Sequence, residues 1–274
     1  MEKEEKKKKK KKRHLKFHIK LIIFIILLVV YAFLIGPKGI FIKDYNIKTN
    51  KLSNNYDGLK ILQFSDLYYG STVTKKDVKN LVKKINSANA DVVIFTGNLI
   101  SDDKIDDNGV ISFLKKELSK INADYGKYFV LGDDDTNDSL NILNSAGFTD
   151  VDKSEEIIYK DNKTPILLIS QNCKSYFEEN DTNMYKILII NNPDNFDNVK
   201  KYDFDIVLSG NNLNGLINIY KLKDLLIESK YKNAYQKIGN TKMYINAGIG
   251  TRNIKVRLFN HPTINLYRFE TKTK

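Results

Sequence analysis

The stretch Leu59-Lys-Ile-Leu-Gln-Phe-Ser-Asp-Leu-Tyr-Tyr-Gly70 decides the fold. Residues 61–64, which are apolar except for Gln63, predict a buried β-strand that ends in the polar tip 65–68. Four later segments repeat this design, each a short β-branched or aromatic run that stops at small and polar residues: 91–98, 128–135, 185–193 and 205–212. Runs of this length suit strands that are covered on both faces. Because ligands bind outside the carboxyl ends of the strands in open α/β sheets, the five tips predict one composite site.

Helical patterns separate the first three strands. Thr74 and Asp77 form a capping-box pattern, and apolar residues follow it at helical spacing. The order strand, helix, strand, helix, strand is that of a parallel βαβαβ unit. The expected fold class is therefore α/β, a two-sheet sandwich with helices outside (α/β/β/α). Its other predicted elements are helices at 110–118 and 138–145, a hairpin of 155–159 with 165–170, and strands at 40–52 (an edge strand), 243–250 and 264–269.

The first forty residues differ from the rest of the chain. Residues 1–20 hold eleven Lys and Arg against three Glu, a surplus of 8 in a net charge of +12, and predict a disordered cytoplasmic tail. Residues 21–36 predict a transmembrane anchor, slightly shorter than the usual length of about 20 residues. A cleaved signal peptide is the competing interpretation, but no small-x-small cleavage site follows the apolar run.

The anchor also predicts the topology. The lysines before it place the amino terminus in the cytoplasm and the body outside the cell membrane, as a single-pass protein. Residues 37–58 are then a linker with the edge strand, and residues 59–274 form the domain. The expected partners of the first segments are the membrane, through the helix, and anionic lipid, through the basic tail.

Charge and cysteine content exclude several classes of protein. After residue 20 the chain has 34 basic and 30 acidic residues, so no nucleic-acid partner is expected. Cys173 is the single cysteine, which excludes an intramolecular disulfide. No Walker loop, Gly-x-Ser-x-Gly elbow or dinucleotide fingerprint is present.

The order of the tips resembles the calcineurin-like metallophosphoesterases, in particular their membrane-anchored bacterial branch. The ending Gly248-Ile-Gly-Thr-Arg…Val256-Arg-Leu-Phe…His261-Pro-Thr is similar to the ending of that branch, so the resemblance covers residues 59–269. It implies two metal ions that activate a bridging hydroxide for in-line attack on a phosphoester.

The ligand positions depart from the family pattern. The family's Asp-x-His is Asp66-Leu67-Tyr68 here, its Gly-Asp is Gly97-Asn98, and its Gly-Asn-His-Asp/Glu is Gly132-Asp133-Asp134-Asp135. The fourth motif's histidine is Asn191. The fifth motif, Gly-His-x-His-Gly-Gly, has Asn211 and Leu213 in place of its histidines.

Such a site lacks the usual ligands of a dinuclear centre. A neutral amide at 98 cannot hold two dications together, and none of the three histidines, at 14, 18 and 261, lies at a tip. We therefore expect a catalytically degenerate domain with no metal cofactor, in which Asp134 occupies the family's acid position. The remnant metal-site positions would be Asp66, Tyr68, Asn98, Asp133, Asn191, Asn211 and Leu213.

Several alternatives stay open at this stage. Asp66 and Asp133–135 could converge on one hard cation (Mg²⁺, Mn²⁺ or Ca²⁺), or Asp66 could cap its loop while the Asp triplet forms a solvated turn. The asparagines could line a ligand cleft or could be positions under no catalytic demand. Arg252 and Arg257 could meet anionic lipid or form surface salt bridges.

Three functions follow from these alternatives. The first is a binding module for a phosphorylated envelope ligand or a protein partner. The second is a residual hydrolase of phospholipid-like or nucleotide phosphoesters with one metal at Asp66 and Asp133. In the third, the basic tail is the working part.

Overall fold

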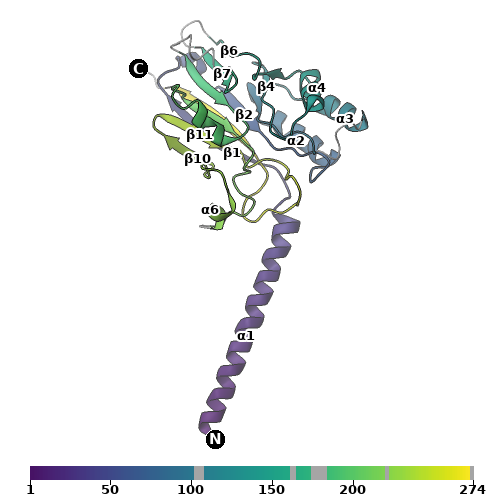
Figure 1. Ribbon diagram of the computed structural model, residues 1–274, viewed down its shortest axis with the longest axis vertical. Coiled ribbons are helices and arrows are strands. Elements are labelled where there is room, and N and C mark those ends of the chain that lie inside the picture. Colours follow the sequence, from purple (N-terminus) through teal and green to yellow (C-terminus); the bar gives the residue numbers. More distant parts are fainter. Residues whose placement is uncertain (102–107, 161–164, 174–183, 220–221, 272–274) are drawn as a thin grey trace.

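Two six-stranded sheets face each other in the computed structural model, and a long N-terminal helix extends from one end of the body (Figure 1). The structure describes residues 1–101, 108–160, 165–173, 184–219 and 222–271. The first sheet has the order β1 (Phe41–Thr49), β12 (Thr263–Thr271), β2 (Lys60–Phe64), β3 (Val92–Phe95), β4 (Lys127–Phe129), β5 (Thr149–Asp150). The second has the order β10 (Tyr235–Ile238), β11 (Thr241–Ile245), β9 (Ile206–Ser209), β8 (Tyr185–Ile189), β7 (Ile166–Ser170), β6 (Glu156–Ile158). The predicted α/β sandwich is confirmed.

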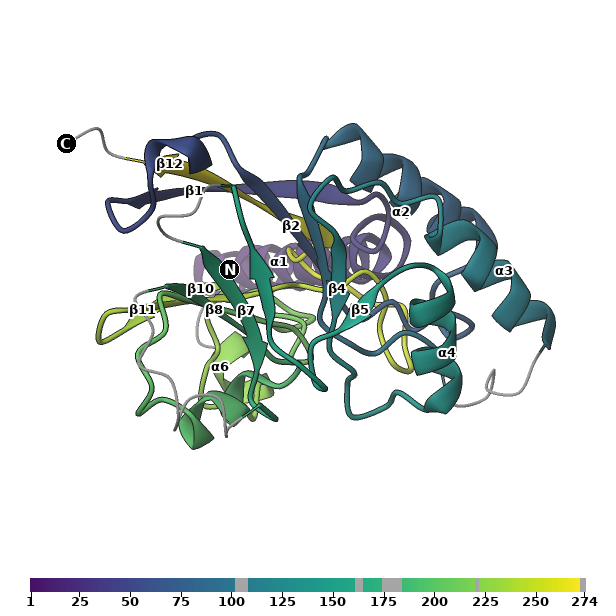
Figure 2. The ribbon, with the colours of Figure 1, turned by 90° about the horizontal axis from the view of Figure 1, so that it is seen from above.

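Three helices cover the outer face of the first sheet: α2 (Lys75–Ser87), α3 (Asn108–Leu118) and α4 (Asn137–Ser145) (Figure 2). The predicted capping box starts α2, because the Thr74 hydroxyl accepts from the Asp77 backbone N–H and the Asp77 carboxylate accepts from the Thr74 N–H. The apolar face of α2 is buried against the sheet. A second core fills the space between the sheets, which is why β2, β3, β8 and β9 are covered on both faces.

The second sheet is covered differently on its outside. Among the described residues, the 3₁₀-helix η4 (Pro193–Asn198) and Tyr231 pack there. Strand β10 and the short helix α6 (Leu222–Leu226) were not predicted from the sequence. The hairpin of β6 with β7 is confirmed as antiparallel, and its turn, 161–164, lies outside the described residues.

Strand directions place all five predicted tips at one end of the body. β1 is parallel to β12, with Phe41 opposite Thr263, and β12 is antiparallel to β2, with Asn265 opposite Gln63. The end of β2 therefore lies level with the start of β1, which follows the N-terminal helix. β3 and β4 are parallel to β2. The ends of the second sheet meet them, since a Cβ on Gly210 would lie 2.7 Å from the Ser65 Cβ.

The N-terminal helix α1 (Glu2–Val30) continues into the π-helical segment η1 (Tyr31–Ile35). Of the described residues, 2–35 form the one helix long and apolar enough to cross a membrane. The Lys-rich residues 2–20 are helical in the structure, which differs from the expected disorder. Lysine has a good helix propensity, and the apolar helix that follows supplies a turn from which the tail extends.

The last turn of this helix is docked on the body. The Arg257 N–H donates to the Ala32 carbonyl at 2.9 Å, and His261 Nδ1 lies 2.9 Å from the Gly36 carbonyl oxygen. The Tyr31 hydroxyl lies 3.2 Å from the other ring nitrogen of His261. Helix and domain are therefore joined by specific contacts as well as by the chain.

We expect the Gly36→Ala substitution to disturb this junction. A Cβ at position 36 would lie 1.8 Å from the Arg257 carbonyl oxygen, so backbone must shift to admit it. The expected loss in free energy of unfolding is about 1–3 kcal/mol, measured by chemical denaturation of the full chain in detergent. Leu34→Ala, at a side chain that is 57% exposed, is the matched control and should change stability little. Equal stability of the two variants would show that the junction tolerates the added methyl group.

Candidate functional site

The carboxylate of Asp66 lies at the centre of the strand ends. The residue follows β2, is fully buried and has a φ of 52°. Its Oδ1 accepts from Asn98 Nδ2 at 2.8 Å, and its Oδ2 accepts from the Ser65 hydroxyl at 2.5 Å and from the Asn211 N–H at 3.1 Å. Asp66 therefore does not cap its own loop. Its partners come from the ends of β2, β3 and β9.

Asparagines connect Asp66 to the end of β4. The Asn98 side-chain oxygen accepts from the Asp134 N–H at 3.3 Å, and Asn211 Nδ2 donates to the exposed Asp133 at 3.4 Å. The same Asn98 Nδ2 lies 3.4 Å from the Asn211 side-chain oxygen. Asp66, Asn98 and the half-buried Asn211 therefore contact one another, and the exposed Asp133 lies at the rim of the cluster.

Two further predicted positions lie against glycines of this cluster. Asn191 donates to the Thr96 carbonyl at 2.6 Å and fills the space where a Cβ of Gly97 would be. Leu213 and Asp66 both pack against Gly248, where a Cβ would lie 2.5 Å from Leu213 and 2.8 Å from Asp66. The structure therefore brings together all the predicted positions, while their role as a remnant metal site stays a prediction.

The backbone at these positions is in the left-handed region. Positive φ values occur at Asp66, Tyr68, Asn98, Asn211 and Leu213, between 44° and 65°. For side chains such as Tyr and Leu this conformation costs about 1–3 kcal/mol and persists only when the surrounding structure imposes it. The surrounding strand ends therefore impose this backbone conformation on Tyr68 and Leu213.

The Asp triplet does not converge on one point. Asp135 accepts from the backbone N–H groups of Gly132, Asn98 and Leu99 at 2.7–2.8 Å. Asp134 pairs with Arg252 at 2.8 Å and accepts from the Tyr68 hydroxyl at 3.1 Å. Among the residues that the structure describes, no group of three His, Cys, Asp or Glu side chains could hold a metal ion.

The role of Arg257 was not predicted from the sequence. Arg252 forms a surface salt bridge, which was one of the two alternatives for the arginines. Arg257, in contrast, is buried and only 1% exposed. Its guanidinium donates to the carbonyls of Ala247, Gly248 and Gly250 at 2.8–3.2 Å. Burial lowers the pKa of Arg257 to about 10, while the nearby Asp66 raises it, so the group stays charged at neutral pH. Nothing in the local sequence pattern distinguishes this arginine from its exposed neighbours.

Two grooves flank the cluster. One is lined by Tyr68, Ser71, Asp134 and Arg252. The other runs past Asn192, Asn211 and Asn212 to the residues around 227. Each groove has polar residues of the strand ends in its lining, Tyr68 and Asp134 in the first and Asn211 in the second, whereas Asp66 itself is buried.

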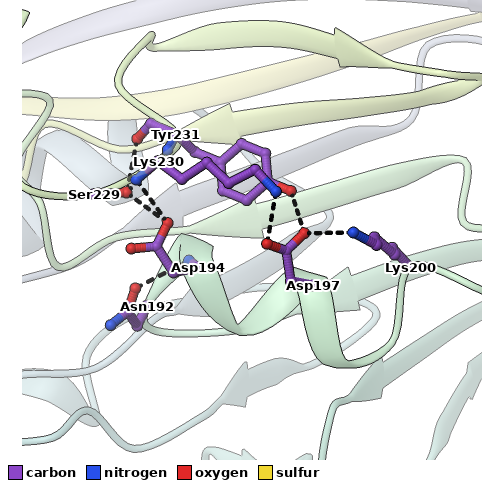
Figure 3. A network of polar contacts seen from close by, with 7 residues as sticks. All are labelled: Asn192, Asp194, Asp197, Lys200, Ser229, Lys230 and Tyr231. Carbon is purple, nitrogen blue, oxygen red and sulfur yellow. Dashed lines mark hydrogen bonds and ion pairs between the residues drawn. The ribbon is translucent and has the colours of Figure 1, made fainter.

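A network of polar contacts fixes one wall of the second groove (Figure 3). Asp194 accepts from the Ser229 hydroxyl and from the Lys230 N–H at 2.9 and 3.0 Å. Asp197 accepts from Lys230 and from the Tyr231 hydroxyl, and these bonds lower its pKa to about 2. η4 and segment 229–231 are therefore held together at neutral pH.

The pH dependence of stability should report the buried Asp66. Burial raises the pKa of Asp66 from 3.8 to about 6, against hydrogen bonds that lower it. The folded state therefore favours the protonated acid, and this stabilisation is present below pH 4 and lost as the pH rises through 6. The rise in the pKa of Asp66 corresponds to about 3 kcal/mol of unfolding free energy. Relative to Asp66→Asn, the wild-type chain should lose about this free energy of unfolding between pH 4 and pH 7. A difference that is constant over this range would show that the carboxylate is stabilised in its charged form.

Comparison with known proteins gives relatives of one kind. No family model matches the chain. The metallophosphoesterase YkuE of Bacillus subtilis, described as uncharacterized, is 24% identical over 260 residues, which cover 88% of this chain and 89% of that protein. A Danio rerio transmembrane protein with a metallophosphoesterase domain is 25% identical over 50% of this chain and 32% of its own length.

Solved structures of low similarity also align. A dimetal phosphatase from Danio rerio aligns with a TM-score of 0.46 and 8% identity, over 70% of this chain and 88% of that one.

Proposed function

We propose that this chain, whose curated relatives are metallophosphoesterases, is a catalytically degenerate, membrane-anchored member of that family that acts as a binding module at the cell envelope. Its ligand would be a phosphorylated lipid, an envelope polymer or a protein partner. The proposed topology is single-pass, with the Lys-rich amino terminus in the cytoplasm and the domain outside. The apolar α1 and the membrane protein among the relatives support the anchor.

The observation that carries the proposal is the hydrogen bonding of Asp66. In a dinuclear centre its carboxylate would face cations, whereas here both oxygens accept N–H and O–H donors. Asn98 points an N–H at Asp66 from the position where the family has the bridging carboxylate. An amide that donates to the first ligand cannot at the same time neutralise two metal ions. The residues present do not fit the family's two-metal centre.

The alternative is a residual hydrolase with one hard cation. It is favoured by a specific observation: Asp66 accepts from the backbone N–H of Asn211 and Asp133 accepts from its side-chain amide, so two carboxylates lie beside this one asparagine. Carboxylate and amide oxygens are ligands that Mg²⁺, Mn²⁺ and Ca²⁺ accept. Substrates would be phospholipid-like or nucleotide phosphoesters.

Metal titration and hydrolysis separate the two proposals. The full chain in detergent would be titrated with Mn²⁺, Mg²⁺ and Ca²⁺ by calorimetry and assayed with an aryl phosphodiester, beside Asp66→Ala and Asp133→Ala. The binding module predicts no saturable binding at Asp66 and no turnover above that of Asp66→Ala. Saturable binding with turnover, abolished in both variants, would establish the hydrolase instead. Deleting residues 6–13 tests the third function, in which the tail alone is needed.

A further inference from the structure

The end of the body from which α1 leaves carries exposed apolar side chains. Phe259, 49% exposed, packs against Tyr31 with ring centroids 5.5 Å apart. Ile254, 59% exposed, lies three residues before Arg257, whose backbone contacts Ala32. Leu225 of α6 is 80% exposed, and Figure 1 shows α6 at this same end. Large apolar side chains on a soluble surface mark an interaction site when they gather.

Cations accompany these apolar residues. A groove of about 210 Å³ lies between the linker 37–40, α2 and the segment 249–257. Lys38, Lys84 and Lys255 line it, and the acidic residue of its lining, Asp77, is held by the α2 cap and lies 4.0 Å from Lys255. Basic and apolar side chains together are the composition of surfaces that lie in the headgroup region of a bilayer.

We propose that this end of the domain, defined by Lys38, Leu225, Ile254, Lys255 and Phe259, is a membrane face that lies on an anionic lipid surface. The apolar side chains enter the boundary between headgroups and acyl chains. The lysine-lined groove receives headgroup phosphates. The contacts of Gly36 and Ala32 with the body hold the domain at the end of α1, so the membrane face, which rests on the proposed membrane anchor, adjoins the point where that helix would leave the bilayer.

The proposal also orients the candidate site. The ends of β2, β3 and β4 lie level with the start of β1, at the same end of the body as the membrane face. A ligand that enters the grooves beside Asp66 from the lipid surface would therefore carry its recognised group in the headgroup layer.

The chain contains no tryptophan, which gives a direct test. Full-length Leu225→Trp and Ile254→Trp would each be placed in nanodiscs of phosphatidylcholine and phosphatidylglycerol, with and without bromine near the top of the acyl chains. Bromine should reduce the tryptophan fluorescence of both variants by roughly twofold, because their indole rings lie at the boundary between headgroups and acyl chains. Tyr159→Trp is the matched control: Tyr159 is 56% exposed and follows β6, which lies at the far end of the body (Figure 1). Its emission should be unchanged.

A second arm tests the lysines. Lys38→Gln and Lys255→Gln, combined in the Ile254→Trp chain, should weaken quenching in discs with phosphatidylglycerol and leave it unchanged in discs of phosphatidylcholine alone. Emission of Leu225→Trp and Ile254→Trp that bromine does not alter would overturn the proposal, as would a chain that does not stay with the discs. Equal quenching at 159 would show that the domain has no preferred face.

Discussion

Replacing Arg257 with methionine should lower the free energy of unfolding by about 3–5 kcal/mol. The guanidinium is buried, and it is the hydrogen-bond donor to the carbonyls of Ala247, Gly248 and Gly250. Methionine fills much of the space but offers no donor, so three buried carbonyls lose their partner. The positive charge near Asp66 is also lost, which raises the pKa of that carboxyl further.

The same substitution at Arg252 is the matched control. The Arg252 side chain is 60% exposed and pairs with Asp134 at 2.8 Å. Surface ion pairs contribute about 0–1 kcal/mol, so Arg252→Met should change stability by no more than this. Chemical denaturation of both full-length variants in detergent, followed by tyrosine fluorescence, measures the difference. Equal midpoints would show that the buried guanidinium does not support the segment 247–250. Arg257→Lys should recover only part of the loss, because one ammonium group cannot reach all three carbonyls.

The framework of the fold follows from local sequence patterns. Residues 92–95, and residues 61–64 apart from the buried Gln63, are apolar because both faces of β2 and β3 are covered, by helices on one side and by the second sheet on the other. The capping box at Thr74 fixes the start of α2 within its own turn. Such patterns need no knowledge of distant residues, and for this reason they could be read from the chain alone.

Elements without a local pattern could not be predicted. β10 alternates between exposed and half-buried residues, so its apolar content is low, and it is a strand because it pairs with β11. α6 has five residues and buries none of them. The tail was expected to be disordered because blocks of like charge usually are. It is helical in the structure because it continues the apolar helix that follows it.

Which residues gather at the candidate site could be predicted from the sequence, but the contacts that each side chain makes there could not. Parallel strands bring their ends together, so the gathering of Asp66, Asn98 and Asn211 follows from the order of the tips. Asp135 shows the limit: its carboxylate accepts three backbone N–H groups from 97–99 and 132–135, a closure that exists only after two loops meet. Charge alone made it a candidate ligand, but geometry makes it a structural residue.

Strand-end geometry and ligand chemistry are separable in this protein. The left-handed backbone at 66, 68, 98, 211 and 213 is set by the two sheets and by close contacts of Gly97, Gly132 and Gly248. Metal affinity depends on charge and donor type at the same positions. Changing a single side chain should therefore alter cation binding without rebuilding the fold.

Asn98→Asp tests this separation. The new carboxylate would lie at hydrogen-bond distance from Asp66, since Asn98 Nδ2 is now 2.8 Å from Asp66 Oδ1. Without a cation, two buried anions in contact should cost about 3–5 kcal/mol of unfolding free energy at pH 7, and protonation at pH 5 should recover part of it. A divalent ion that binds the pair should restore stability, by about 2.7 kcal/mol at a hundred times its dissociation constant.

Thermal or chemical unfolding with and without Mn²⁺ measures the effect in the full chain. The wild type, in which Asn98 donates to Asp66, should show no gain from Mn²⁺ and serves as one control. Asn98→Ala is the other, because it removes the amide without adding charge and should lose stability that no cation restores. If Mn²⁺ stabilises Asn98→Asp alone, the strand ends retain a cation-binding shape and the amide is what excludes the ion. If it stabilises the wild type as strongly, the carboxylates of Asp66 and Asp133 already bind a cation, and the single-metal hydrolase replaces the binding module.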